Sequence, residues 1–306
     1  MCDCIIVGAG PAGLTAAIYL IRENKKIKIL EKESIGGKIA SSARVENYPG
    51  FKSISGAALA DSLYEQVTNL GGVIDIEEVQ SIKNGKIKEV ITDEGVYETK
   101  SIIIATGTHY NTLNLDMEEK YLGNGISFCT VCDGAFYKDK VVAVVGGANT
   151  AIINAIYLSS IAKVVYLIVR SDTLKGEASV IDELLEKENI KILYESNVIK
   201  YLGDDTLTGI VVKTKDGEQT LEVSGVFMSI GQIPETKEFS NLIELDSNNY
   251  IKSSEECTTN IPGIFVAGDV REKRVRQLTT AMNDGTIAAL NVIDYLKNIE
   301  NYPEKD

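Results

Sequence analysis

The sequence contains a single histidine, His109, and no tryptophan. A catalytic dyad or triad that uses histidine would depend on this one residue, and a metal centre built from several histidines is excluded. Basic residues are in the minority, since 31 Lys and Arg stand against 44 Asp and Glu and give a net charge of −13. Because nucleic-acid binding needs clustered Lys and Arg, we expect no nucleic-acid partner.

The sequence also lacks long apolar runs and a recognisable targeting signal. No stretch reaches the length of a membrane-spanning helix, and a signal peptide would need a basic start and a longer apolar run than the N-terminal residues provide. The five cysteines form an odd and sparse set, unlike the disulfide framework of a secreted protein. These absences predict a cytoplasmic protein without a membrane partner.

One pattern occurs twice in the chain. With 306 residues, the protein is long enough for two domains that each have a core. Residues 3–31 contain an apolar strand, a glycine-rich turn, an apolar helix and a second strand, and residues 141–169 repeat this order. The continuous Val- and Ile-rich strands are typical of a buried parallel sheet.

Further elements follow each repeat. Turn sequences at residues 84–85 (Asn-Gly) and 216–217 (Asp-Gly) separate short alternating runs, which predicts a small antiparallel meander in each half. Residues 263–269 add one more strand that ends in a turn, and a helix over about 278–296 follows. We expect this C-terminal part to rejoin the first repeat.

The predicted fold class is therefore α/β, with two Rossmann-like nucleotide-binding domains of the three-layer ββα type. The first domain is discontinuous and comprises residues 1–113 and 244–306. The second domain comprises residues 114–243 and carries the second repeat.

The first glycine-rich loop, residues 8–13, has the context that a dinucleotide-binding loop requires, because it follows a strand, opens a helix and is followed by Glu31. Gly8 allows the tight turn, Gly10 lets backbone amides approach a pyrophosphate, and Gly13 lets the helix pack closely on the strand. The helix N-terminus supplies partial positive charge, and Glu31 can accept hydrogen bonds from a ribose. A glycine-rich turn without a ligand is the alternative.

Cys129 and Cys132 form a Cys-x-x-Cys sequence directly before Asp133. At this spacing two sulfurs can close a small, reducible disulfide, especially at a helix N-terminus, which favours the thiolate. Half of a structural zinc site is the alternative. Such a site needs two more ligands, and the other cysteines and His109 form no second pair of this kind.

The order of these motifs resembles that of the low-molecular-weight thioredoxin reductases, over nearly the whole chain. The resemblance implies the architecture shared with glutathione reductase, FAD in the first domain, and a homodimer. The motifs that carry it are Gly-Ala-Gly-Pro-Ala-Gly at 8–13, Gly-Gly at 36–37, Glu-Asn-Tyr-Pro-Gly-Phe at 46–51, Ala-Thr-Gly at 105–107, Cys-Thr-Val-Cys-Asp-Gly at 129–134 and Ala-Gly-Asp-Val-Arg at 267–271.

The same resemblance implies roles for residues along FAD. Asp269 is expected to bond the ribityl chain, and Arg276 and Gln277 to begin the helix that faces the flavin. Lys38 stands where the family usually has glutamine, and it could stabilise a reduced, anionic flavin or point to solvent. The predicted cofactor-binding residues, with no metal ligands, are Gly8, Gly10, Pro11, Ala12, Gly13, Glu31, Lys32, Gly36, Gly37, Lys38, Asn47, Val79, Ala105, Thr106, Gly107, Gly268, Asp269, Arg276, Gln277 and Leu278.

For the cysteine pair, the resemblance implies that Cys132 is the sulfur nearest the flavin and that Cys129 is the interchange thiol that attacks the disulfide of thioredoxin. Asp133 is expected to donate or accept the proton, and it could also cap a helix. In this family the domain that carries the pair rotates, so that the pair alternates between the flavin and the external disulfide.

The second glycine-rich loop departs from a nucleotide-binding site at three places. Ala148 replaces the glycine where backbone must approach a pyrophosphate, so a methyl group intrudes. Val169 stands at the position that matches Glu31 and cannot bond a ribose hydroxyl. The basic cluster that is usual in the family is reduced to Arg170 and the more distant Lys175.

This pattern resembles the ferredoxin-dependent flavin thioredoxin reductases, in which ferredoxin passes single electrons to FAD, and the flavin reduces the cysteine pair. One alternative is an NADPH-dependent thioredoxin reductase with a weakened nucleotide site. Another is a flavin-containing redox sensor without turnover. The basic segment 271–276 is a candidate docking surface for ferredoxin, although its charges could instead serve FAD and solubility.

Overall fold

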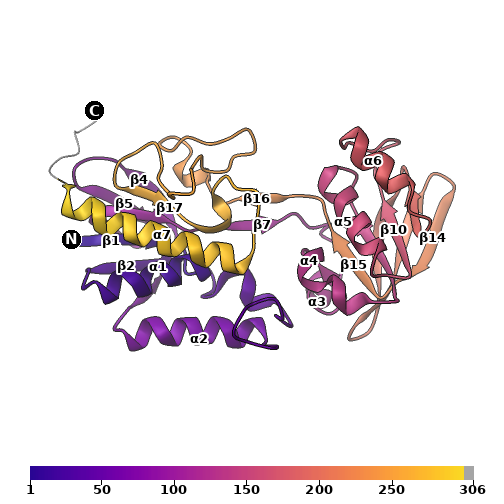
Figure 1. Cartoon of the computed structure of the whole chain (residues 1–306), viewed down its shortest axis with the longest axis horizontal. Helices are drawn as coiled ribbons and strands as arrows, with labels where there is room; N and C mark the ends of the chain where they lie inside the picture. Colours follow the sequence, from indigo (N-terminus) through magenta and orange to yellow (C-terminus); the bar gives the residue numbers. More distant parts are fainter. Residues whose placement is uncertain (300–306) are drawn as a thin grey trace. The chain divides into compact units, whose positions relative to one another are not determined.

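The computed structural model describes residues 1–299 (Figure 1). The described chain divides into two compact units. The first unit comprises Met1–Ser42, Tyr48–His109 and the chain from Ile233 onward, and the second comprises Ala43–Asn47 and Tyr110–Gln232. Both units contain a Rossmann-like sheet, which confirms the predicted α/β class with two domains.

The first unit is built on a seven-stranded sheet in the order β3-β2-β1-β6-β5-β4, with β17 also paired to β6. Its strands are β1 (Cys2–Val7), β2 (Ile27–Glu31), β3 (Ile74–Ile76), β4 (Val79–Lys83), β5 (Lys88–Thr92), β6 (Val96–Ile104) and β17 (Ile264–Val266). The pairs β1–β2, β2–β3, β1–β6 and β6–β17 are parallel, whereas β4–β5 and β5–β6 are antiparallel. The structure thus confirms the first meander, which continues the parallel sheet.

Three helices complete this unit: α1 (Pro11–Arg22), α2 (Gly56–Asn69) and α7 (Leu278–Lys297). Helices α1 and α7 lie side by side (Figure 1). Their close approach requires glycine at position 285, because a β-carbon there would lie 2.2 Å from the carbonyl oxygen of Ala12. The C-terminal part of the chain therefore rejoins the first repeat, as predicted. Among the described residues, no helix combines the length and the apolar character that crossing a membrane requires.

The chain returns to the first unit at Ile233, earlier than the predicted boundary at residue 244. Two short strands, β7 (Thr108–Tyr110) and β16 (Gln232–Pro234), pair where the chain leaves and re-enters this unit. After β16, Phe239 and Ile243 are buried in the core of the first unit. Burial of these two side chains is the physical reason for the earlier return.

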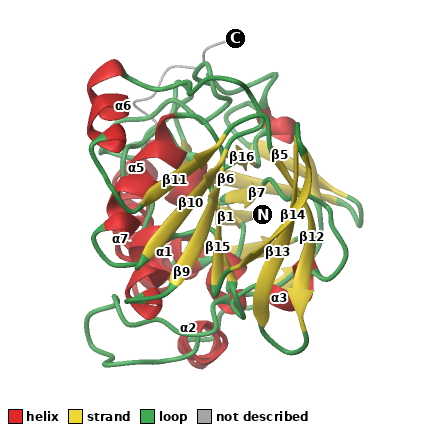
Figure 2. Ribbon diagram, turned by 90° about the vertical axis from the view of Figure 1, so that its right-hand side faces the viewer, coloured by secondary structure: helices red, strands yellow, loops and turns green. Residues whose placement is uncertain are grey.

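The second unit contains a parallel sheet in the order β11-β10-β9-β15-β8 and a separate antiparallel sheet, β12-β13-β14, which confirms the second meander. Its main elements are β8 (Ile126–Ser127), α4 (Thr130–Asp133), β9 (Val141–Val145), α5 (Asn149–Ser159), β10 (Val164–Ile168), α6 (Ala178–Leu185), β11 (Ile190–Leu193), β12 (Asn197–Gly203), β13 (Leu207–Thr214), β14 (Gly217–Glu222) and β15 (Gly225–Met228). Helices α5 and α6 cover one face of the parallel sheet, and β12–β14 lie over the other (Figure 2).

Alternation along β9 explains these three layers. Val142 and Val144 pack in one core with the buried residues of α5, whereas Ala143 and Val145 pack in another core with residues of β12 and β13. Because successive side chains point to opposite faces of a strand, an entirely apolar strand must be covered on both sides. The continuous apolar run at 141–145 therefore specifies a strand with a layer on each face.

A buried ion cluster fixes the segment that follows β17. The Asp284 carboxylate, which is 1% exposed, accepts hydrogen bonds from Arg271 Nε at 2.9 Å and Lys273 Nζ at 2.8 Å. It also accepts one from the backbone amide of Gly268 at 3.1 Å. The side chains of Arg271 and Lys273 are each 4% exposed. The side chains of Arg271 and Lys273, two of the four cations in the candidate docking segment 271–276, are therefore buried and cannot form part of a docking surface.

We predict that Asp284→Asn destabilises the first unit by about 3–5 kcal/mol, because it leaves two buried cations without their shared anion. The measurement is the free energy of unfolding from urea denaturation. Asp294→Asn is the matched control, since Asp294 lies exposed on the same helix and its replacement should change stability by less than about 0.5 kcal/mol. Equal stability of the two variants would contradict the structural role of the cluster.

Candidate active site

The first glycine-rich loop joins β1 to α1 and has the geometry predicted for dinucleotide binding. Gly8 has φ +107°, and a β-carbon there would lie 2.4 Å from the carbonyl oxygen of Ala105. A β-carbon at Gly13 would lie 1.9 Å from the carbonyl oxygen of Gly8. At Gly10, by contrast, a β-carbon would meet nothing within 4 Å. The N-terminus of α1 is therefore open on the side from which a pyrophosphate can approach.

Glu31, at the end of β2, holds this loop in place. Its two carboxylate oxygens accept hydrogen bonds from the amides of Ala9 at 2.8 Å and Glu33 at 2.9 Å. Each carboxylate oxygen has a second lone pair, so the predicted hydrogen bond from a ribose hydroxyl to Glu31 is compatible with these two contacts. Gly36 and Gly37 lie against the same loop, because the Gly36 amide donates to the Ala9 carbonyl at 2.8 Å.

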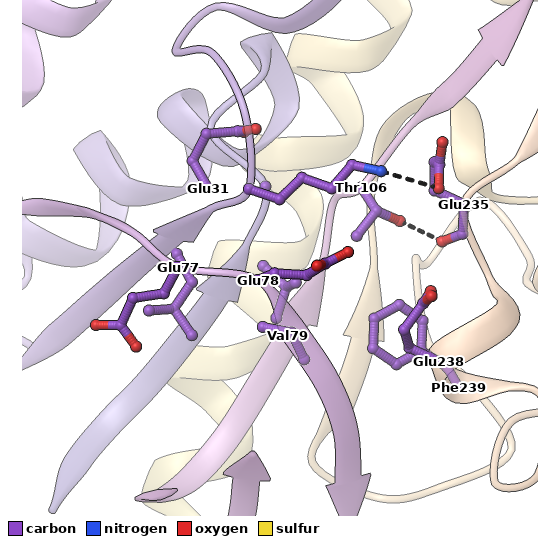
Figure 3. Close-up of a pocket in the computed structure, with 12 residues that line it drawn as sticks. Glu31, Glu77, Glu78, Val79, Thr106, Glu235, Glu238 and Phe239 are labelled. Atoms are coloured by element: carbon purple, nitrogen blue, oxygen red, sulfur yellow. Dashed lines mark hydrogen bonds and ion pairs between the residues drawn. The ribbon is translucent and has the colours of Figure 1, made fainter. Parts of the chain in front are cut away.

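A pocket lies beside this loop (Figure 3). It brings together five residues of the predicted cofactor-binding set, and the lining also contains four glutamates that the sequence did not indicate. The predicted residues are Gly8, Glu31, Lys32, Val79 and Thr106, and the additional glutamates are Glu77, Glu78, Glu235 and Glu238.

Glu235 joins two other residues of the pocket wall, Lys32 and Thr106, and also contacts His109 outside it. Its carboxylate contacts Lys32 Nζ at 3.2 Å and His109 Nδ1 at 2.5 Å, and its carbonyl accepts a hydrogen bond from Thr106 Oγ1 at 2.7 Å. Burial raises the pKa of Glu235, but the contacts with His109 and Lys32 outweigh it, and the pKa lies below its usual value. The His109 side chain is half exposed, and Glu235 is its partner.

Asp269 and Lys38 form an ion pair on the same unit. Lys38 Nζ lies 2.7 Å from Asp269 Oδ2 and 2.7 Å from Thr108 Oγ1, so its side chain does not simply point to solvent. The second oxygen, Asp269 Oδ1, is buried and has no hydrogen-bond partner within residues 1–299. A buried oxygen without a donor is unfavourable, and a ribityl hydroxyl is a donor of the required kind. The residues present therefore fit FAD.

The start of α7 has the structure expected from the resemblance. Gln277 is the N-cap and forms a capping box with Thr280, and Leu278 is the first helical residue. Arg276 donates to the Asp269 carbonyl at 3.1 Å and stacks on the ring of Tyr250 at 3.9 Å. Asn47 is the one member of the predicted set that groups with the second unit.

In the second unit, Cys129 and Cys132 are joined by a disulfide, as predicted. Cys129 is the N-cap of α4, and its sulfur accepts a hydrogen bond from the Cys132 amide at 3.2 Å. The pair therefore lies at a helix N-terminus, where partial positive charge favours a thiolate once the disulfide is reduced. Because the two sulfurs are bonded to each other, they are not zinc ligands in this state.

Asp133 lies at the other end of α4 and accepts a hydrogen bond from Ser127 Oγ at 2.6 Å. Asp133 also occupies the N-cap position of the short helix Gly134–Tyr137 that follows, but its side chain makes no capping hydrogen bond there. Burial raises the pKa of Asp133, and Ser127 and Arg44 offset this shift only in part. A carboxyl group with a raised pKa beside a disulfide is suited to donate a proton.

Sequence reasoning missed the polar contacts behind the cysteine pair. Thr130 Oγ1 donates to Asn154 Oδ1 at 2.6 Å, and Asn154 Nδ2 donates to Ser229 Oγ at 2.8 Å. Phe128, next to Cys129, stacks on Tyr110 with ring centroids 4.1 Å apart. These partners come from α5, from the loop after β15 and from β7, so no local pattern in the sequence indicates them.

The second glycine-rich loop repeats the backbone of the first but not its open space. Ala148 is the N-cap of α5 with φ −97° and ψ 175°, close to the values of −75° and −179° for Gly10. Its methyl group therefore stands where Gly10 leaves room. Val169 is fully buried, and a β-carbon at Gly147 would lie 2.6 Å from its side chain. Arg170, by contrast, is exposed.

Comparison with known proteins agrees with this geometry. Residues 2–285 match the pyridine nucleotide-disulphide oxidoreductase family. The chain is 42% identical over 298 residues to the "34.2 kDa protein in rubredoxin operon" of Clostridium pasteurianum, covering 96% of this chain and 97% of that relative. It is 39% identical over 308 residues to the thioredoxin reductase of Listeria monocytogenes, with 99% and 97% covered.

Solved structures give the same result. The thioredoxin reductase of Streptococcus pyogenes superimposes with a TM-score of 0.94 at 38% identity, over 97% of this chain and 99% of that one. Thioredoxin reductases are FAD-dependent flavoproteins, which confirms the predicted cofactor. The chain therefore belongs to the pyridine nucleotide-disulphide oxidoreductase family, in which several of its relatives are named thioredoxin reductase.

Proposed function

We propose that this protein is a flavin-dependent thioredoxin-disulfide reductase that receives its electrons from reduced ferredoxin. The Cys129–Cys132 disulfide at the N-terminus of α4, with Asp133 on the same helix, is the observation that carries the reductase activity. The altered second loop, with Ala148 and the buried Val169, supports a donor other than a nicotinamide nucleotide. From the resemblance to thioredoxin reductases we expect a homodimer, and from the composition of the sequence a cytoplasmic protein.

The reaction balances with two electrons and two protons for each disulfide. Two reduced ferredoxins and one thioredoxin disulfide give two oxidised ferredoxins and one thioredoxin dithiol. Bound FAD supplies the ability to accept electrons singly and to deliver them in pairs. Because the cysteine pair must meet both the flavin and an external disulfide, we expect the second unit to move between the two steps.

The chain's own residues perform the exchange. Once the pair is reduced, the Cys129 thiolate attacks the thioredoxin disulfide and forms a mixed disulfide, while one thioredoxin sulfur leaves and takes a proton. Cys132 then attacks Cys129, which releases the second thioredoxin sulfur and restores the original disulfide. Asp133 is placed to hold the transferred proton, because burial favours its neutral form.

NADPH-dependent reduction is the second candidate function. Arg170 and Lys175 are exposed, and within residues 1–299 neither side chain makes an ion pair or hydrogen bond. Two such cations could hold a 2′-phosphate. A non-turnover redox sensor is the weaker alternative, because the reducible disulfide and its neighbouring acid are both present.

We predict that Cys132→Ser lowers thioredoxin turnover at least about a thousandfold, because the electron path from the flavin to the disulfide is removed. Turnover is measured with an artificial electron donor, so that the result does not depend on the natural donor. Cys2→Ser is the control, since Cys2 is a free cysteine of β1 outside the pair. Normal turnover of Cys132→Ser would show that another route reduces thioredoxin.

Asp133→Asn should lower turnover by about a hundredfold or more, because the proton donor is lost.

In the native enzyme, the protonated form of Asp133 is depleted as pH rises through its raised pKa, so turnover should fall as pH rises. The hydrogen bond from Ser127 lowers this pKa, so Ser127→Ala should shift the fall to higher pH. Identical pH profiles for the native enzyme and Ser127→Ala would argue against Asp133 as the titrating group.

The choice of donor is tested by restoring the lost nucleotide contacts. We predict that the native enzyme turns over with reduced ferredoxin and only marginally with NADPH. The double variant Ala148→Gly, Ser171→Arg should raise NADPH-driven turnover by roughly tenfold or more, since the glycine reopens the loop and the arginine adds a cation directly after Arg170. Its ferredoxin-driven turnover should be unchanged. Fast NADPH turnover by the native enzyme would favour the second candidate function.

A further inference from the structure

Lys38 ties together three segments that are far apart in the sequence. It lies on the short helix η1 (Gly37–Ser41), next to the first glycine-rich loop. Its ammonium group contacts Asp269 Oδ2 on the short helix η4 (Gly268–Val270) and Thr108 Oγ1 at the start of β7, each at 2.7 Å. The Lys38 side chain is 32% exposed and that of Asp269 is 17% exposed, so the pair is partly shielded from water.

The ion pair fixes which oxygen of Asp269 remains available. Lys38 engages Oδ2, while Oδ1 is buried without a hydrogen-bond partner among the described residues. The backbone at this position is also held, since Arg276 Nε donates to the Asp269 carbonyl at 3.1 Å. Asp269 therefore presents one buried acceptor in a fixed direction, and no described group of the protein satisfies it.

We propose that Lys38 is a positioning residue of the FAD site, which holds Asp269 so that Oδ1 accepts a hydrogen bond from a hydroxyl group of the cofactor. This inference depends only on FAD binding within the proposed function, and the identity of the electron donor does not affect it. Lys38 acts through Asp269. Its contribution to FAD affinity should therefore disappear when the Asp269 carboxylate is removed.

A cation suits this role better than the glutamine that is usual at the position. A hydrogen bond between an ammonium and a carboxylate is roughly twice as strong as one between neutral groups. It also offsets the cost of placing a carboxylate where water has limited access. Arginine would keep the charge, glutamine would keep only a neutral donor, and methionine would keep neither.

The experiment measures the dissociation constant of FAD for the full-length protein, after removal and reconstitution of the flavin, by quenching of flavin fluorescence. We expect Lys38→Met to weaken FAD binding roughly ten- to hundredfold, Lys38→Gln to weaken it less, and Lys38→Arg to restore most of the affinity. Lys83→Met is the matched control, because Lys83 forms an exposed ion pair with Glu89 in the same unit. That control should bind FAD like the native protein.

A double-mutant cycle shows whether Lys38 acts through Asp269. In the Asp269→Asn background, Lys38→Met should cause at most about a twofold further loss of FAD affinity. Additive losses, or native affinity in Lys38→Met, would overturn the proposal. The unfolding temperature of each flavin-free variant separates loss of binding from loss of folding, and Lys38→Gln replaces Lys38→Met if the latter does not fold. If the native protein itself bound no FAD, the proposed function would fail, whatever the variants do.

Discussion

The contact between the turn after β1 and Ala105, which directly follows the neighbouring strand β6, is the constraint on which the flavin site depends. Gly8 lies so close to Ala105 that no side chain fits between them, and Gly13 lies even closer to Gly8. These contacts place the N-terminus of α1 directly at the end of the sheet. The open side at Gly10, the carboxylate of Glu31 and the neighbouring Gly37 are then brought together around one position.

In the second unit, the turn after β9 has the same backbone geometry as the turn after β1, but it is lined by different side chains. A β-carbon at Gly146 would lie 2.4 Å from the Ser229 carbonyl, so the strand-to-helix geometry is preserved. The open space at Gly10 is not repeated, since Ala148 carries a methyl group at the matching position. Val169 has become part of the core behind the loop. The unit therefore keeps the fold that supports the disulfide on α4, while its loop differs from the first loop at Ala148 and Val169.

The sequence predicts the parts of the fold that have a local signal. Strong apolar periodicity and glycine-rich turns predict both repeats, both meanders and α7, and the spacing of Cys129 and Cys132 predicts the disulfide. The early return at Ile233 has no such signal, because β16 and the short helix after it are each three residues long.

Within the site, the contacts that escape prediction join distant segments. Lys38 forms an ion pair with Asp269, and Lys32 forms one with Glu235. Asp284 forms ion pairs with Arg271 and Lys273 of the candidate docking segment. Each of these contacts forms only because the fold brings distant segments together. A single charged residue has no periodic pattern in the sequence from which its partner could be predicted. The disulfide pair, by contrast, lies within one turn of helix and is specified locally.

The most direct measurement is an anaerobic titration of the purified flavoprotein, followed by the visible absorbance of the flavin. We expect only marginal bleaching with NADPH or NADH at about 1 mM, near the upper end of ordinary KM values, and complete bleaching with reduced ferredoxin. Rapid, stoichiometric bleaching by NADPH would contradict ferredoxin as the donor, and would show that Arg170 and Lys175 suffice to bind the nucleotide.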